Sequence, residues 1–380
     1  APAVTPAPSA APAPIPVLAE SAPAIAHTPA VPGGIAAAAA PAPAPAGAPA
    51  SAPVPAPAPG TGSVDIALVL PLDSPDYARA ATAVRDGFLA AAQAANAADR
   101  CRVIAHDDKG VLGAFEAARA FGASVVVGPL VRDDLRRLAE SRDALPLTLA
   151  LNQLDDATAL PPQVYTLALS VEGDARALAR RMRDGGATTV VVIGDDSPIS
   201  KRFATAFHGE WLLAGGGPTE AVRFDPRPDG LTVLRSALSK SNASAAVLAL
   251  DGPDAAVARS FALRIPVYAI SLVNQPHESA AMADLEGVRF IDVPWLVTPD
   301  LPALAKLPRR DTGNVLLDRL YALGLDAFQV ARAFVRGVPE RLEIAGATGQ
   351  ITLAEGRHFA RDGVLAEFRR GQVVPADAPR

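Results

Sequence analysis

Three pairs of adjacent aspartates are the residues of this chain whose type and spacing could do chemistry. Asp107-Asp108, Asp155-Asp156 and Asp195-Asp196 each follow a predicted strand, and two neighbouring carboxylates can work as a general acid and a general base. Aspartate after a strand also accepts hydrogen bonds from nearby amides and caps helices. We interpret the pairs as turn and cap residues, and we expect Asp195-Asp196-Ser197 to cap a helix that begins near Pro198.

Other catalytic signatures are missing from the sequence. It contains no Gly-x-x-x-x-Gly-Lys phosphate loop, no Gly-x-Gly-x-x-Gly after a strand and no Gly-x-Ser-x-Gly nucleophile elbow. The histidines are scattered, without the helical spacing of a metal site: His27, His106, His208, His277 and His358. We therefore predict that the chain is not an enzyme and that it takes no cofactor and no metal.

The composition divides the chain into two parts. Residues 1–60 contain 17 Pro and 24 Ala, no Lys or Arg, and one acid, Glu20. Such a segment lacks the large apolar side chains that would offset backbone ordering, and it favours polyproline II. We predict a disordered Ala/Pro-rich linker over 1–62, which would reach up to about 180 Å at ~3.1 Å per residue.

Charge and cysteine content exclude several classes of protein. The net charge of −5 and the absence of a Lys/Arg run argue against a nucleic-acid partner. No apolar run is long enough to span a bilayer. The single cysteine, Cys101, precludes an internal disulfide, and we expect it to be a small buried apolar residue.

Strand and helix patterns alternate from residue 64 onward, which predicts an α/β fold with parallel sheets. Predicted strands cover 65–70, 102–106, 124–127, 147–151, 164–169, 188–193, 221–224, 245–250, 266–270 and 287–295. Predicted helices cover 77–95, 113–121, 132–142, 172–184, 198–213, 231–239, 254–262 and 314–336. Short antiparallel strands are expected over 346–353, 358–361 and 364–370.

Two such series in tandem predict two Rossmann-like lobes around a cleft, of the type I periplasmic-binding-protein kind. The predicted domain covers 63–380 and crosses between the lobes three times. Lobe 1 is expected at about 63–170 and 295–340, and lobe 2 at about 171–294 and 341–373. In open α/β sheets ligands bind at the carboxyl ends of the strands. The candidate cleft residues are therefore Asp73, Ser74, Gly128, Pro129, Leu130, Asn152, Gln153, Asp195, Ser197, Asp251 and Ser271.

Several segments resemble the LpoA-type, or LppC, family of lipoprotein activators of penicillin-binding proteins, in their C-terminal periplasmic-binding-protein-like domain. The most specific are RLYALGLDAF at 319–328 and GATGQITL at 346–353. The others are IALVLPL at 66–72, AVRDGFLAA at 83–91, VVGPLVR at 126–132, LPLTLALNQ at 145–153, PVYAIS at 266–271 and DLEGVRFIDVPWL at 284–296. The resemblance runs over nearly all of 64–373.

The resemblance implies a non-enzymatic, outer-membrane-anchored lipoprotein that faces the periplasm. It would bind a bifunctional penicillin-binding protein, which is a peptidoglycan synthase, and stimulate its cross-linking activity. The lipid anchor would lie outside this chain. Longer family members carry a helical-repeat domain where this sequence has its Pro/Ala segment. Candidate partner-surface residues are Pro294, Trp295, Gly346, Ala347, Thr348 and Gly349.

The same fold also serves solute-binding proteins of ABC importers, for amino acids or similar small polar ligands. Amino-acid binders of this type usually place Ser and Thr after the third and fourth strands. Here those positions read GPLVRDD and ALNQLDD, which disfavours such a site. The importer protein remains the alternative, and whether the cleft binds a small molecule is open at this point.

Overall fold

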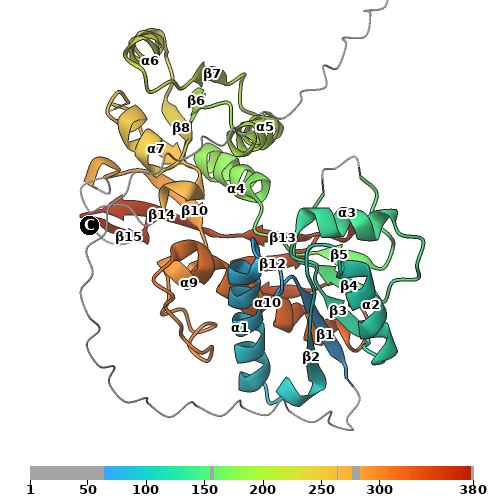
Figure 1. Ribbon diagram of the computed structural model, residues 1–380. Coiled ribbons are helices and arrows are strands. Elements are labelled where there is room, and N and C mark those ends of the chain that lie inside the picture. The colour runs from blue at the N-terminus through green and yellow to red at the C-terminus, as the bar shows by residue number, and fades with distance from the viewer. Residues whose placement is uncertain (1–63, 155–157, 263, 276–282, 378–380) are drawn as a thin grey trace, which may run out of the picture. The chain divides into compact units, whose positions relative to one another are not determined.

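A computed structural model describes residues 64–154, 158–262, 264–275 and 283–377. The predicted linker over 1–62 lies outside the described residues, as do Asp155-Asp156 and His277. The described part contains a five-stranded parallel sheet, a seven-stranded mixed sheet, a small third sheet and helices on both faces of the two large sheets (Figure 1).

Lobe 1 is built on a five-stranded parallel sheet of order β2-β1-β3-β4-β5. Its strands are β1 (Ile66–Leu70), β2 (Cys101–Ala105), β3 (Val125–Val127), β4 (Leu147–Ala150) and β5 (Val164–Thr166). Alternate residues of β1 face opposite cores: Ile66, Leu68 and Leu70 on one side, Ala67 and Val69 on the other. Both faces are therefore covered, which explains why the strand is apolar throughout.

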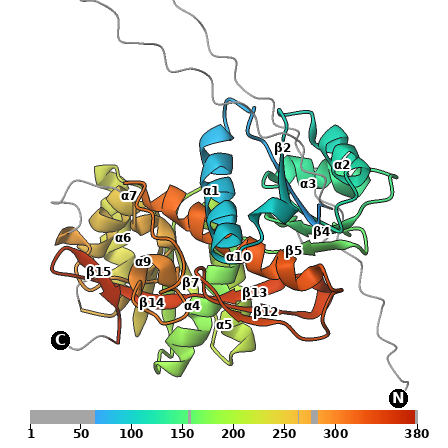
Figure 2. The same cartoon turned by 90° about the horizontal axis from the view of Figure 1, so that it is seen from below.

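Helices cover the two faces of this sheet. The first face packs on α1 (Ala78–Ala94) and α10 (Val315–Phe334), and the second on α2 (Val111–Ala120) and α3 (Arg132–Glu140). The helices α1 and α10 make extensive contact with each other where they cross (Figure 2). A short helix η1 (Ala98–Arg100) leads into β2.

Lobe 2 is built on a seven-stranded sheet of order β15-β14-β10-β9-β8-β6-β7. The parallel strands are β6 (Val190–Gly194), β7 (Glu220–Arg223), β8 (Ala245–Ala249), β9 (Val267–Ala269) and β10 (Arg289–Asp292). Two antiparallel strands complete it, β14 (Val364–Arg369) and β15 (Gln372–Pro375). Its helices are α4 (Val171–Asp184), α5 (Pro198–Leu213), α6 (Pro228–Lys240), α7 (Gly252–Arg259) and the short η2 (Ser271–Val273).

A third sheet joins β11 (Glu343–Ala345), β12 (Gln350–Leu353) and β13 (Phe359–Asp362) in antiparallel order, with η3 (Glu355–Arg357) between the last two. Ile351 and Phe359 belong to the core of lobe 1. The expected boundaries gave all of 341–373 to lobe 2. The structure divides that segment between the lobes, because only the part from Val364 onward joins the lobe 2 sheet.

The chain passes between the lobes three times: over residues 167–170, after Asp292 and at Gly363. The predicted α/β alternation and the three crossings are confirmed. One strand prediction was too long, since 287–295 is a strand only over β10, and α9 (Pro294–Val297) begins at Pro294. The GATG residues at 346–349 form the turn before β12 instead of its first half.

Candidate functional site

Lobe 1 has a cavity of about 370 Å³ at the carboxyl ends of its strands, and it brings the candidates Leu130 and Asn152 together. Asn152 Nδ2 donates to the Leu130 carbonyl at 2.9 Å, and Asn152 Oδ1 accepts from the Gln153 amide at 2.9 Å. The side-chain amide thus ties two strand-end loops together. The lining is mostly apolar, with Tyr77, Ala80, Leu130, Leu151, Leu169, Leu320 and Leu323.

The other lobe 1 candidates shape the loops instead of facing a ligand site. Ser74 is buried, and its Oγ accepts from the Tyr77 amide at 3.2 Å. Asp73 is exposed. Gly128 has a φ of +120°, and a Cβ there would overlap the Val69 carbonyl, so this position of the Gly128-Pro129 loop requires glycine.

The lobe 2 candidates cap helices. Asp195 Oδ1 accepts from the Ser197 amide at 3.0 Å, and Ser197 Oγ accepts from the Ser200 amide at 3.2 Å, at the start of α5. This confirms the predicted cap. Asp251 caps α7 through the Asp254 amide at 3.2 Å. The carbonyl of the last candidate, Ser271, accepts from an arginine of lobe 1, described below.

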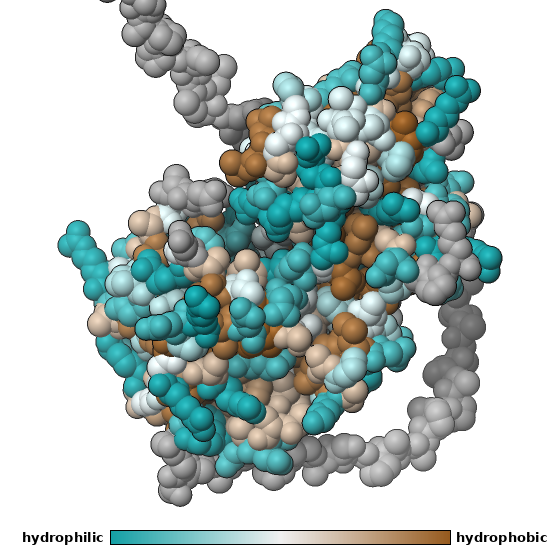
Figure 3. All heavy atoms as spheres, turned by 180° about the vertical axis from the view of Figure 1, so that it is seen from behind, coloured by the Kyte–Doolittle hydropathy of each residue, from teal (hydrophilic) through white to brown (hydrophobic). Residues whose placement is uncertain are grey.

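A second cavity of about 290 Å³ lies between the lobes, and the surface is hollowed there (Figure 3). Gln153 and Leu154 of lobe 1 face α4 and α5 of lobe 2 across it. The lobe 2 lining is charged, with Glu172, Arg176, Lys201 and Arg202. Of the sequence candidates only Gln153 lines this cavity, so the strand-end residues of the two lobes do not converge on one site.

The six residues proposed as a partner surface are all buried: Pro294, Trp295, Gly346, Ala347, Thr348 and Gly349. The structure therefore corrects the expectation that they form an exposed surface. Trp295 packs on Tyr321, with ring centroids 5.7 Å apart. The turn at 346–349 is held in its buried position by hydrogen bonds from its amides to a carboxylate of α10.

That carboxylate is Asp326, which is fully buried. Its Oδ1 accepts from the Ala347 amide at 2.7 Å, and its Oδ2 accepts from the Thr348 amide at 2.7 Å and the Thr348 hydroxyl at 2.6 Å. A Cβ at Gly346 would lie 2.6 Å from the carboxylate, so the turn requires glycine there. Burial raises the pKa of Asp326 to about 6, although the three donors act in the opposite direction.

We predict that Asp326→Asn removes a pH dependence of stability. Because its folded pKa of about 6 exceeds the ordinary 3.8, Asp326 contributes stability at pH below 3.8 that is lost as the pH rises through 6, on the order of 3 kcal/mol. The free energy of unfolding, measured with urea from pH 4 to 7, should therefore differ in slope between the wild type and Asp326→Asn.

Thr348→Val is the matched control for this comparison. It removes a donor that lowers the pKa of Asp326 but leaves the carboxylate in place. The free energy of unfolding of this variant should fall with rising pH as it does in the wild type, and the fall should continue to higher pH. If the free energy of unfolding depends on pH in the same way in the wild type and in Asp326→Asn, the pKa of Asp326 is not raised in the folded protein.

Two buried ion pairs connect the lobes where the chain crosses between them. Arg319 of α10 donates through Nε to Asp292 Oδ1 at 2.8 Å and through Nη2 to Oδ2 at 2.7 Å. Asn274 Nδ2 also donates to Asp292 Oδ2 at 2.8 Å, and Arg319 Nη2 reaches the Ser271 carbonyl at 3.0 Å. Both charged partners of this pair are nearly inaccessible to solvent.

The second pair joins Arg361 of β13 to Asp174 of α4, and Arg361 Nη1 also donates to the Thr348 carbonyl at 2.9 Å. Burial raises the pKa of Asp174, which Arg361 opposes. Sequence reasoning missed these residues as a group. The available signal was the motif at 319–328, which contains both Arg319 and Asp326.

A protein-family model described as "LppC putative lipoprotein" matches residues 61–252 and 254–371. The chain belongs to the LppC lipoprotein family. This confirms the resemblance carried by the 319–328 and 346–353 motifs.

Curated relatives of this LppC protein are named penicillin-binding protein activator LpoA. The protein from Mannheimia succiniciproducens is 26% identical over 319 residues, which cover 82% of this chain and 55% of the relative. The protein from Escherichia coli K12 is 27% identical and covers 67% of this chain and 44% of the relative. The chain thus spans about half the length of the relatives it matches.

Two solved structures resemble this LppC protein over most of its length. The C-domain of LpoA from Haemophilus influenzae, described as a regulator of PBP1A, has a TM-score of 0.71 and 24% identity, covering 82% of this chain and 99% of that chain. A "putative branched-chain amino acid ABC transporter" from Chromobacterium violaceum has a TM-score of 0.69 and 35% identity, covering 80% and 99%. The first similarity concerns the fold alone.

None of the described helices combines the length and hydropathy that a bilayer crossing requires. Across residues 64–154, 158–262, 264–275 and 283–377, no three His, Cys, Asp or Glu side chains gather as a metal site would require.

Proposed function

We propose that this chain binds a bifunctional penicillin-binding protein and stimulates its cross-linking of peptidoglycan. It would act in the periplasm, held to the outer membrane by a lipid anchor outside this sequence, and without catalysis of its own. Membership of the LppC family is the observation that carries the proposal. The relatives named as penicillin-binding protein activators support it.

The polar side chains of the candidate cleft form hydrogen bonds within the chain, which supports a function based on a protein–protein surface and not on ligand binding in the cleft. The side-chain hydrogen bonds of Asn152, Ser197 and Asp251 stabilise loops and helix caps of the chain itself. In addition, the buried Arg319–Asp292 and Arg361–Asp174 pairs hold the lobes together at their crossings. A protein that captures small solutes needs free polar groups in its cleft, whereas an activator needs a defined surface.

We predict that the full chain raises the cross-linked fraction of peptidoglycan made by a purified bifunctional synthase at least two-fold. The measurement is chromatography of muropeptides released from newly made glycan, with binding followed in parallel by surface plasmon resonance. Serum albumin at the same concentration is the control. Neither binding nor a change in cross-linking at a saturating concentration of the chain would contradict the proposal.

The alternative is a solute-binding protein of an ABC importer. It is favoured by the 35% identity to the Chromobacterium violaceum protein and by the charged cavity between the lobes. Arg176 and Arg202 could meet the carboxylate of an amino acid there. Calorimetry with the twenty amino acids would distinguish the two functions, since micromolar binding of one of them, lost in Arg176→Ala, would favour the importer protein.

A further inference from the structure

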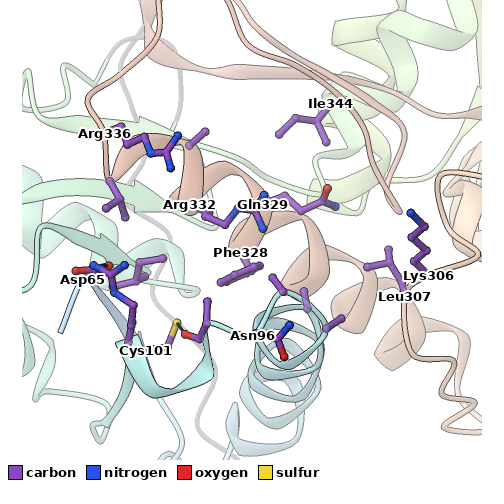
Figure 4. Close-up of a pocket in the computed structure, with 18 of the residues that line it drawn as sticks. Asp65, Asn96, Cys101, Lys306, Leu307, Phe328, Gln329, Arg332, Arg336 and Ile344 are labelled. Atoms are coloured by element: carbon purple, nitrogen blue, oxygen red, sulfur yellow. Dashed lines mark hydrogen bonds and ion pairs between the residues drawn. The ribbon is translucent and has the colours of Figure 1, made fainter. Parts of the chain in front are cut away.

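Lobe 1 also has a groove of about 1000 Å³, which shares no lining residue with the cavity between the lobes. It lies at the amino-terminal ends of β1 and β2, which begin at Ile66 and Cys101. The cavity of about 370 Å³ described above lies at the opposite, carboxyl ends of the strands of this sheet. The end of α1, the second half of α10 and β11 form its other walls (Figure 4). Neither the strand-end candidates nor the interlobe ion pairs line this groove.

The floor of the groove is apolar. Phe328 is buried at its centre (Figure 4), and the buried Ile66 also lines the groove. Around them lie apolar side chains that are only half-buried, which leaves part of their surface open to a partner. These half-buried residues are Ala95, Ala97, Leu307, Val335, Leu342 and Ile344.

The rim of the groove is cationic. The side chains of Lys306, Arg332 and Arg336 line it and are exposed, and no hydrogen bond or ion pair joins these side chains to any described residue. Arg100 also lines the groove but is paired with Asp65, the one acidic residue among the described lining residues. This concentration of positive charge contrasts with the net charge of −5 of the whole chain.

We propose that this groove is the docking site for an acidic, amphipathic segment of a partner protein. Apolar side chains of the segment would cover the half-buried floor, and its carboxylates would pair with Lys306, Arg332 and Arg336. The inference rests on the proposed function, in which the partner is a peptidoglycan synthase. The chain's own residues 1–60 match the groove less well, because Glu20 is their only acid.

The charge of the rim is the part of the groove that a variant can reverse without disturbing the core. We expect the triple variant Lys306→Glu, Arg332→Glu, Arg336→Glu to bind the purified synthase at least ten-fold more weakly than the wild type, mostly through a slower association rate. Binding of the wild type should also weaken as salt is added.

A matched triple variant controls for the change in net charge. Lys109→Glu, Arg142→Glu and Lys240→Glu reverse three exposed cations that do not line the groove, and should leave the affinity for the synthase unchanged. If the synthase binds the wild type and both triple variants equally, the groove proposal is overturned and the proposed function stands.

Cys101 reports on occupancy of the groove, because it lines the groove and is the only cysteine of the chain. Burial raises the pKa of its thiol to about 11, so labelling with a thiol reagent will be slow but measurable at alkaline pH. The synthase should slow the labelling of the full chain several-fold. It should not slow the labelling of the rim triple variant.

A fragment without the N-terminal segment identifies the other occupant of the groove. Residues 58–380 form a compact unit of their own, with the cores described above. If Cys101 is labelled faster in this fragment than in the full chain, and the synthase gives no protection, the groove holds the chain's own segment. That result overturns the proposal.

If no synthase binds the wild type, the proposed function fails and the groove is tested with peptides alone. The probes are an alternating Glu/Leu peptide and the Lys/Leu peptide of the same length. Protection of Cys101 by the Glu/Leu peptide only, lost in the rim triple variant, supports an acidic segment as occupant. Protection by both peptides or by neither overturns it.

Discussion

Gly324→Val is expected to destabilise the protein by about 3 kcal/mol or more, because inserted volume in a tightly packed contact forces backbone shifts. Gly324 lies on α10 where this helix meets α1. A Cβ there would overlap the Val84 carbonyl of α1, and a Cβ at Gly87 of α1 would overlap the Tyr321 carbonyl of α10. The neighbouring atoms are backbone on both sides, so relief requires the helices to move apart.

The free energy of unfolding from urea titrations, followed by circular dichroism, measures this effect. Gly324→Ala should fall between the wild type and Gly324→Val. Gly113→Ala is the matched control, because it is also a helical glycine but has open space at its Cβ position. It should be neutral or stabilising by up to about 1 kcal/mol. Equal stability of the Gly324 and Gly113 variants would refute the close approach of α1 and α10.

Arg319→Met is expected to destabilise the protein by about 3–5 kcal/mol, since it leaves a buried carboxylate without its cation. In the variant, Asp292 would keep only the Asn274 amide and the Val293 amide as donors. The loss should appear in the same urea titrations. Replacing both partners, as Arg319→Met with Asp292→Leu, should recover much of it because the unpaired charge is gone.

Arg181→Met is the control for this second prediction. Arg181 also pairs across the lobes, with Asp362 at 3.3 Å, but both side chains are more than 40% exposed. Exposed pairs contribute little, so we expect a loss below about 1 kcal/mol. A comparable loss in Arg181→Met and Arg319→Met would mean that burial of the Arg319 pair does not determine its importance.

The fold was predictable where local signals agree with burial. Helix α5 spans the predicted residues 198–213, since Ser197 caps it, Pro198 suits its first turn and Gly215 follows its end. The short edge strands β11 and β15 were missed. Their residues are largely exposed or half-buried, so neither shows the apolar run by which the central strands were recognised.

The candidate site was less predictable, because its decisive contacts join residues far apart in sequence. The GATG turn looked suited to exposure, but Asp326 of α10 binds its amides and buries it. The pairing of Arg319 with Asp292 likewise depends on how α10 crosses the end of β10. The family motif at 319–328 marked both residues without indicating what they contact.

The three crossings have a consequence for how this protein is made and handled. Lobe 1 takes α10, and lobe 2 takes β14 and β15, from the last third of the chain. Neither lobe can be expressed alone from one continuous stretch of gene. A stop codon shortly before Val364 would remove β14 and β15 from the lobe 2 sheet. A stop codon before Asn314 would also remove α10 and expose the core of lobe 1. Neither lobe can therefore complete its fold until the C-terminal part of the chain has been synthesised.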